Sequence, residues 1–182
     1  SRAAMTPLDA LEEAAHCVLC LVMDNPMTQS SVAKLGGIQP LVSLVRKSSP
    51  KAQDCAARAL FHLSSQQENQ IMVAEAGAVR PLVGMLSSDG ETAAELAAVV
   101  MVHLIHGIPA ISQSIAEKGG IVPLSAILRQ GSPGAQQQAA AVLAELALVP
   151  PIRDLIANAG AIKQLIGLLK SPTIDTPEVA AR

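Results

Sequence analysis

Aromatic side chains are nearly absent from this chain of 182 residues, which holds one Phe and neither Trp nor Tyr. A core without aromatic rings has to be built from Leu, Ile, Val, Ala and Met, and these side chains suit closely packed helices. Half of the residues are hydrophobic, which is ample for such a core. The composition therefore indicates one globular domain rich in aliphatic contacts.

The chain also lacks an excess of positive charge and a long apolar run. Its formal net charge is −2, whereas a duplex-binding surface needs concentrated Lys and Arg. No apolar run reaches the roughly 18 residues that a membrane-spanning helix requires, and His103 interrupts the most apolar stretch, residues 99–105. We therefore expect no nucleic-acid partner and no membrane span.

Cysteine is scarce as well, because Cys17, Cys20 and Cys55 are the three copies. Three cysteines are too few for a disulfide framework, so we predict a reducing compartment, the cytoplasm, with the nucleus as the alternative. The pair Cys17 and Cys20 has the spacing of a redox or metal pair, but no second ligand pair or βαβ pattern accompanies it. We expect Cys20 to pack in the core, at the position that matches Phe61.

Motifs of catalysis and of phosphate binding are missing too: there is no phosphate loop, no Gly-x-Ser-x-Gly and no His-Glu-x-x-His. His62, His103 and Glu145 are candidates for a metal site, but they are expected on successive helices about 8–10 Å apart. Direct ligation needs about 2 Å from each nitrogen to the metal. We therefore expect no enzyme activity, no cofactor and no metal.

What the chain does contain is an internal repeat. Four segments begin with a glycine and have an aliphatic residue two positions later, namely Ile38, Val79, Ile121 and Ile162. Successive members of this set are 41, 42 and 41 residues apart. A period of roughly 40–47 residues filled with helical pattern is typical of a solenoid built from helical repeats.

One repeat, residues 69–106, predicts three helices. A short helix over 69–75 ends at Gly77, and a second helix over 79–86 carries Pro81 in its first turn, where a missing N–H costs nothing. A longer third helix over 91–105 follows. Its apolar face holds Leu96, Ala97, Val100, Met101 and Leu104 at helical spacing, and Cys55, Ala56, Ala59, Leu60 and Leu63 form the same face one repeat earlier. No segment shows the alternation of a strand, so the chain is expected to be all-α.

The run Val73-Ala-Glu-Ala-Gly77-Ala-Val-Arg-Pro81-Leu-Val-Gly-Met-Leu86, followed by a long helix, resembles the armadillo repeats of β-catenin, importin α and the plant U-box ubiquitin ligases. The resemblance extends over residues 7–182. It implies a right-handed α-solenoid whose third helices line a concave groove. The expected single domain, 1–182, has about four repeats: a lone third helix (7–23), repeats at 28–65, 69–106 and 111–148, and a partial repeat at 152–182.

Both ends are expected to be incomplete. Residues 6–23 have the pattern of a third helix, and residues 180–182 repeat the Ala-Ala-Arg of residues 56–58, inside the next third helix. Neither end has the polar outer face of a capping repeat. We therefore expect a piece of a longer protein, or ends that something else covers. Self-association through the first helix is also expected, and the apolar residues that it is predicted to present are Leu8, Leu11, Ala15 and Val18.

Shifting the third helices by the repeat period aligns rows of side chains on the face that should line the groove. The first row is Glu13, Asp54, Glu95, Gln137 and Glu178; the second is Cys17, Arg58, Val99, Ala141 and Arg182; the third is Leu21, His62, His103 and Glu145, with Ser65, His106 and Leu148 three positions on. The candidate binding residues are Glu13, Asp54, Arg58, His62, Glu95, Val99, His103, His106, Gln137 and Glu145. The alternative is an ordinary solvated helix face with the binding site elsewhere.

We therefore expect a protein-binding module or scaffold that holds an extended or helical segment of a partner along its third helices. The acidic first row favours a partner with Lys or Arg. Importin α uses a ladder of Trp and Asn in this groove, and neither residue stands in the matching rows here, so a nuclear-import receptor is not expected. The alternatives are a segment that docks into a larger assembly through its apolar ends, and the substrate-binding arm of a ubiquitin ligase.

Three Ser-Pro pairs precede third helices, at Ser49, Ser132 and Ser171. Serine as a cap with proline in the first turn is the simple account of this pattern. Proline-directed phosphorylation is the alternative.

Overall fold

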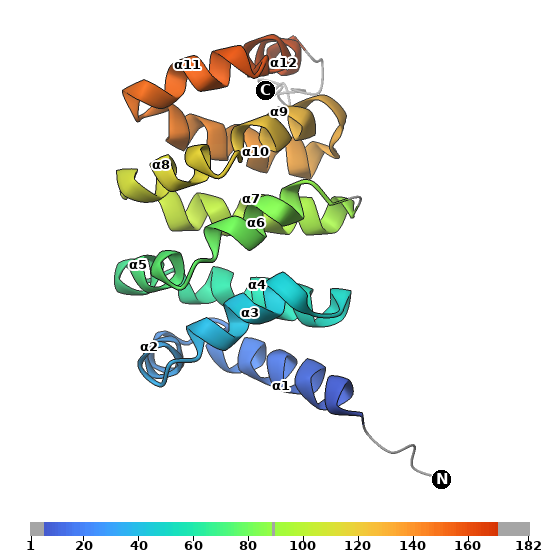
Figure 1. Cartoon of the computed structure of the whole chain (residues 1–182), viewed down its shortest axis with the longest axis vertical. Coiled ribbons are helices and arrows are strands. Elements are labelled where there is room, and N and C mark those ends of the chain that lie inside the picture. The colour runs from blue at the N-terminus through green and yellow to red at the C-terminus, as the bar shows by residue number, and fades with distance from the viewer. Residues whose placement is uncertain (1–5, 89, 171–182) are drawn as a thin grey trace, which may run out of the picture.

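The computed structural model describes residues 6–88 and 90–170, which form twelve helices and no strand. The helices are α1 (Pro7–Val22), α2 (Pro26–Lys34), α3 (Ile38–Lys47), α4 (Pro50–Leu63), α5 (Gln67–Glu75), α6 (Val79–Leu86), α7 (Glu91–Ile105), α8 (Pro109–Glu117), α9 (Ile121–Gln130), α10 (Pro133–Ala147), α11 (Pro150–Asn158) and α12 (Ala161–Leu169). They stack in layers from the N-terminal to the C-terminal end (Figure 1). The expected all-α solenoid is confirmed.

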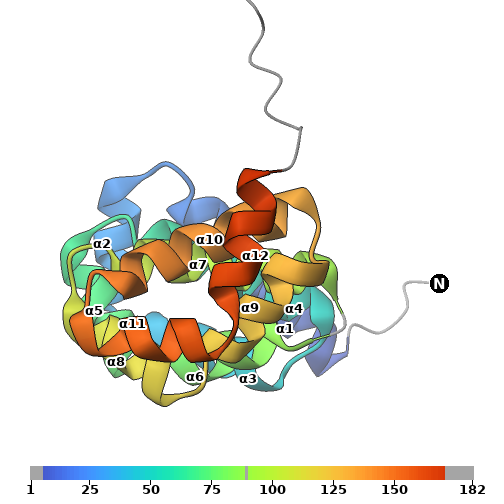
Figure 2. The same ribbon diagram turned by 90° about the horizontal axis from the view of Figure 1, so that it is seen from above.

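Each kind of helix occupies its own side of the stack. The first helices (α2, α5, α8 and α11) lie on the left in Figure 1, and the second helices α3, α6 and α9 lie in front of the third helices α4, α7 and α10, while the third helix α1 lies at the bottom of the stack and the second helix α12 at its top. Figure 2, seen from above, places α7 and α10 on one side and α3 and α6 on the opposite side. A ligand on the third helices and a ligand on the second helices would therefore meet different faces.

The turn from a first to a second helix is built on glycine. Gly36, Gly77, Gly119 and Gly160 all have φ between +77° and +83°, a left-handed conformation that residues with a Cβ rarely adopt. This conformation ends the first helix and redirects the chain into the second. The repeat of these glycines along the sequence therefore marks where each first helix ends.

Serine caps begin two of the third helices. Ser49 Oγ accepts a hydrogen bond from the Ala52 N–H at 3.3 Å, and Ser132 Oγ accepts one from the Ala135 N–H at 3.2 Å. The prediction that these serines cap helices is confirmed. The third pair, at Ser171, lies outside the described residues, as does the expected start of a further third helix with Glu178 and Arg182.

The core lies where third helices pack on one another and on second helices. Leu60, Leu63, Met101 and Leu104 are fully buried, and each such side chain contributes about 1.5–3 kcal/mol by leaving water. The predicted apolar faces of the third helices are confirmed, except that Leu96 is half-buried because it borders a surface depression.

Two expectations for the first helix are wrong. Cys20 is exposed, with its Sγ 3.7 Å from His16 Nε2, because α1 packs on α4 through Ala15, Leu19 and Val22 instead. For the same reason Ala15 is buried at 3% exposure and Val18 is half-buried against the core, so neither is presented as predicted, whereas Leu8 and Leu11 are 49% and 42% exposed.

Candidate functional site

The third helices bring four of the ten predicted site residues into one depression of about 370 Å³. Arg58 and His62 come from α4, and Glu95 and Val99 come from α7. The remaining lining residues are mostly apolar and come from the same two helices and from α1: Leu19, Met23, Phe61, Thr92 and Leu96. The third-helix depression, defined by these nine residues, spans three successive repeats.

The half-buried ring of Phe61 connects two predicted histidines to this depression. Its centroid lies 4.4 Å from that of His103 and 5.1 Å from that of His62, at interplanar angles of 65° and 74°. These are edge-to-face contacts, which aromatic rings prefer over face-to-face stacking. The three rings therefore form one cluster across α4 and α7.

Burial lowers the pKa of His103, and the neighbouring His106 and His62 lower it further because protonated rings would repel. His103 is therefore neutral at pH 7. A neutral imidazole can donate one hydrogen bond and accept another, which suits it to pair with the backbone of a bound segment.

Neighbouring cations neutralise part of the predicted acidic row. Arg58 Nε donates to Asp54 Oδ2 at 2.8 Å, which raises the pKa of Arg58. Lys51 Nζ lies 3.1 Å from Glu13 Oε1 and 3.4 Å from Glu12 Oε2, and these hydrogen bonds raise the pKa of Lys51. Exposed pairs of this kind contribute about 0–1 kcal/mol, but they reduce the field that a partner would feel.

Glu95 differs from the other carboxylates of the row, because it forms no ion pair with any described residue. Its side chain lies against Gly134 in the first turn of α10, where an added Cβ would come within 2.7 Å of Glu95 Oε1. A helix N-terminus favours a nearby carboxylate. Glu95 is therefore the acidic group of the row that the fold positions beside the depression.

The other predicted site residues lie outside this depression. His106 Nδ1 is 3.4 Å from Glu145 Oε1, in a pair that joins α7 to α10. His103 contacts the depression through Phe61, and Asp54 contacts it through Arg58. Glu13 and Gln137 are exposed elsewhere on α1 and α10. The structure thus separates the predicted set into a central group and flanking residues.

Sequence reasoning missed the apolar part of the depression. Phe61 could have been found, because it is the one Phe of the chain and immediately precedes His62 of the third row. Met23 carries no such signal, since it stands in none of the aligned rows; the structure makes it the C-terminal cap of α1, just after the helix, although the predicted helix included it.

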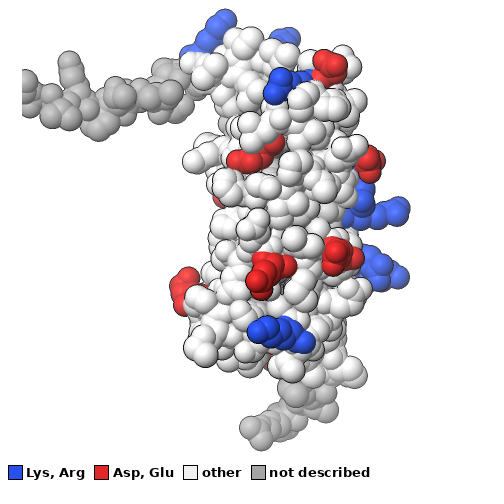
Figure 3. All heavy atoms as spheres, turned by 90° about the vertical axis from the view of Figure 1, so that its left-hand side faces the viewer, with Lys and Arg blue, Asp and Glu red and all other residues white. Residues whose placement is uncertain are grey.

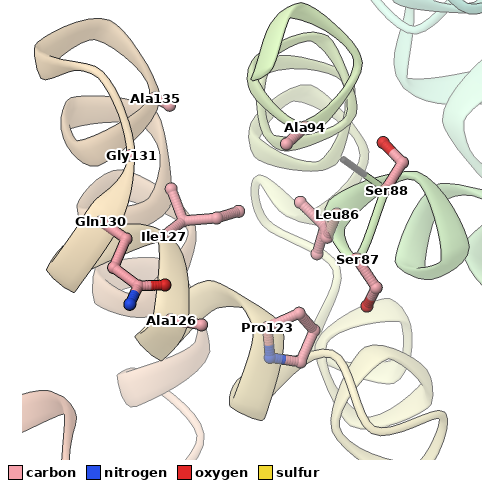
Figure 4. A pocket seen from close by; sticks show the side chains of 10 residues that line it. All are labelled: Leu86, Ser87, Ser88, Ala94, Pro123, Ala126, Ile127, Gln130, Gly131 and Ala135. Atoms are coloured by element: carbon pink, nitrogen blue, oxygen red, sulfur yellow. The ribbon is translucent and has the colours of Figure 1, made fainter. Parts of the chain in front are cut away.

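A second pocket, of about 510 Å³, lies between consecutive second helices and the starts of the third helices that follow them (Figure 4). Its lining residues are Leu86, Ser87, Ser88, Ala94, Pro123, Ala126, Ile127, Gln130, Gly131 and Ala135. Ile127 of α9 points across the pocket toward Leu86 of α6. Nothing in the sequence pattern predicted this α6/α9 pocket.

Within the described part of the chain, no three His, Cys, Asp or Glu side chains lie close enough together to hold a metal ion. None of the described helices combines the length and the apolar character that a membrane span needs.

No protein-family model and no curated protein matches the chain, but solved structures do. An engineered protein is 27% identical, with a TM-score of 0.84, and the match covers 93% of this chain and 69% of that one. A designed armadillo repeat protein in complex with the peptide (KR)4 is 22% identical, with a TM-score of 0.81 and coverages of 92% and 76%. An armadillo-repeats-only protein from Plasmodium falciparum is 20% identical, with a TM-score of 0.80 and coverages of 88% and 73%.

Proposed function

We propose that this armadillo-repeat solenoid is a protein-binding module that holds a segment of a partner protein along α1, α4, α7 and α10. The observation that carries the proposal is the third-helix depression, which combines an apolar lining with a few polar groups. Sites of this composition bind partners, since the apolar surface supplies affinity and the polar groups fix orientation.

The partner segment that fits this depression has an apolar side chain flanked by Lys or Arg. Phe61, Leu96 and Val99 offer apolar contacts, and Glu95 offers a carboxylate that forms no ion pair with a described residue. A designed protein of the same fold binds the peptide (KR)4, which supports a basic partner by analogy with the fold. In place of an Asn ladder, the neutral His103 supplies a hydrogen-bonding group near the groove.

Fluorescence polarisation with labelled peptides tests this proposal. The probes are the octapeptide of four Lys-Arg units and the same peptide with Leu at its fourth position. We expect the Leu peptide to bind more tightly, because it fills the depression. The double variant Asp54→Lys and Glu95→Lys should weaken both peptides by about tenfold or more, since it replaces two attractive charges by repulsive ones.

The matched control is Glu68→Lys with Glu75→Lys, which changes the net charge equally but on the exposed surface of α5. This control should leave both affinities within about twofold, because surface charges more than a Debye length from the ligand are screened. Equal losses in the two double variants would mean that general charge, and not this site, attracts the peptide.

A second candidate function, docking through an apolar end, is favoured by α12. Ile162 is 51% exposed and Leu169 is 78% exposed. The residues at matching positions in the earlier second helices are only 2–5% exposed, because a third helix covers them. For Ile162 these residues are Ile38, Val79 and Ile121. For Leu169 they are Val45, Leu86 and Leu128. We propose a second copy as the occupant, with its α1 lying on this face.

The ubiquitin-ligase arm and the cytoplasmic or nuclear location stay predictions.

A further inference from the structure

Charge is segregated between the two faces of the solenoid. The second helices carry basic residues and no Asp or Glu, and their basic residues are Arg46, Lys47, Arg80, Arg129 and Lys163. The third helices carry the opposite balance, with Lys51 and Arg58 against Asp9, Glu12, Glu13, Asp54, Glu91, Glu95 and Glu145. In Figure 3, basic side chains project from the right-hand edge at mid-height, on the side of the second helices.

The five cations of the second helices are exposed, and none forms an ion pair with another described residue. Helix electrostatics accounts for part of this pattern, because Arg46, Lys47 and Arg129 lie in last turns, where a cation is favourable. Arg80 and Lys163 lie in first turns, where the positive end of the helix dipole disfavours a cation. Helix ends therefore account for Arg46, Lys47 and Arg129 but not for Arg80 and Lys163, which share only the face of the solenoid with them.

The α6/α9 pocket opens on this same basic side. Leu86 and Ile127 form its buried apolar surface, and Ser87, Ser88 and Gln130 lie at its rim (Figure 4). None of the described residues that line it is charged, and Arg129 is adjacent to Gln130 in α9. A ligand here would meet a neutral, largely apolar pocket with Arg129 next to one of its lining residues.

We propose that the second-helix face is a second docking surface, which binds an acidic segment of a partner protein with one apolar side chain in the α6/α9 pocket. The apolar pocket favours a protein over a nucleic acid or a lipid headgroup, because phosphates offer nothing to fill it. Packed helices lie about 8–10 Å apart, and an extended chain advances about 3.3 Å per residue. Arg46 and Arg129 share one position of the repeat, and Arg80 and Lys163 share another, so cations at matching positions recur in alternate layers. Two layers are about 16–20 Å apart, so acidic residues about five to six positions apart in an extended segment would meet them.

This surface is independent of the third-helix depression, since it lies on the opposite side of the stack (Figure 2). The test uses two fluorescein-labelled decapeptides, one of ten Glu and one of nine Glu with a central Leu. The wild-type protein should bind the Leu peptide several-fold more tightly than the Glu peptide, and added salt should weaken both. The variant Arg80→Glu with Arg129→Glu should weaken the Leu peptide by about tenfold or more, because two attractive charges become repulsive.

Two matched controls separate this site from general effects. Lys34→Glu with Lys118→Glu changes the net charge equally but at the C-terminal ends of the first helices α2 and α8, and it should weaken the Leu peptide much less than the Arg80 and Arg129 variant does. Ala126→Phe fills the pocket and should abolish the advantage of the Leu peptide. Ser43→Phe, at the matching position of α3, should keep that advantage. Circular dichroism melts confirm that each variant is folded.

Several results would overturn the proposal: no binding of either decapeptide, equal losses in the two charge variants, or tighter binding of phosphatidylserine vesicles or a ten-base-pair DNA duplex. The variant Asp54→Lys with Glu95→Lys should still bind the acidic peptide. A failure of the basic peptides at the third-helix depression would therefore leave this result unaffected.

Discussion

At the scale of single residues, the interior is closely packed with aliphatic side chains, which offer no polar partner. A charge or a cavity placed there would therefore lower the stability of the protein. Leu60 and Met101 are both fully buried between stacked third helices. We expect Leu60→Asp or Met101→Asp to destabilise the protein by several kcal/mol, since an unpaired charge would be buried. Neighbouring repeats of a short solenoid are coupled, so the loss of helicity should extend beyond one repeat.

Circular dichroism melts measure this effect. The control is Val122→Asp, at a position that is 67% exposed, where a substitution should change stability by about 0.5 kcal/mol or less. An unchanged melting temperature for either core variant would show that its side chain is not enclosed as described.

His103 should make stability depend on pH. Its pKa in the folded protein is lowered from the ordinary value of 6.5, mainly by burial. As the pH falls below 6.5 the unfolded chain takes up the proton first, so the free energy of unfolding decreases until the pH has passed the lower folded pKa. The stabilisation is complete above 6.5. Urea unfolding of wild type and His103→Gln between pH 7.5 and 5 should show a smaller pH dependence in the variant; parallel curves would contradict this account.

At the scale of helices, serine caps fix where third helices begin. Ser132 accepts the Ala135 N–H at the start of α10. Removing this acceptor in Ser132→Ala should cost about 0.5–2 kcal/mol. Ser43, exposed in the middle of α3, is the control, because Ser43→Ala should stabilise slightly through higher helix propensity. Thermal melts that shift in the same direction for both variants would argue against a capping role for Ser132.

The sequence predicts the ends of a helix correctly where glycine or turn residues mark them, and incorrectly where such residues are missing. The predicted bounds of α6 and α7 match the structure, because glycine and the Ser-Ser-Asp-Gly turn delimit them. In contrast, α5 begins at Gln67, two residues before its predicted start. Its N-terminal cap, Gln66, makes no side-chain cap hydrogen bond, and the polar residues that follow show no apolar period.

The candidate site was predictable in part, for a related reason. The repeat period places Arg58, His62, Glu95 and Val99 in register, and the structure gathers them around one depression. A repeat period does not specify side-chain directions, so the sequence predicted neither the pairing of Asp54 with Arg58 nor the position of Glu95 against Gly134. The α6/α9 pocket arises from helix packing between repeats and has no sequence signature.

At the scale of the whole molecule, the ends of the stack should associate. The helices α1 and α12 lie at opposite ends of the stack (Figure 1), and each has exposed apolar side chains, so contact between them is head-to-tail and grows with concentration. Light scattering over a concentration series should show a rising mean mass that Ile166→Glu abolishes. Val122→Glu, at a 67% exposed position on α9 between the two end layers, should leave it unchanged. A constant monomer mass at high concentration would contradict self-association.

The binding of a partner segment at the third-helix depression is the central claim, and the single Phe of the chain allows a direct test. Incorporating 4-fluorophenylalanine gives one fluorine NMR resonance, from Phe61 in the depression. Titration with the Leu-containing basic octapeptide should shift this resonance until the site is saturated. The dissociation constant from this titration should equal the one measured by fluorescence polarisation. The shift should vanish in the double variant Asp54→Lys with Glu95→Lys. A peptide that binds by polarisation while the Phe61 resonance stays unmoved would contradict the account and place the site on another face.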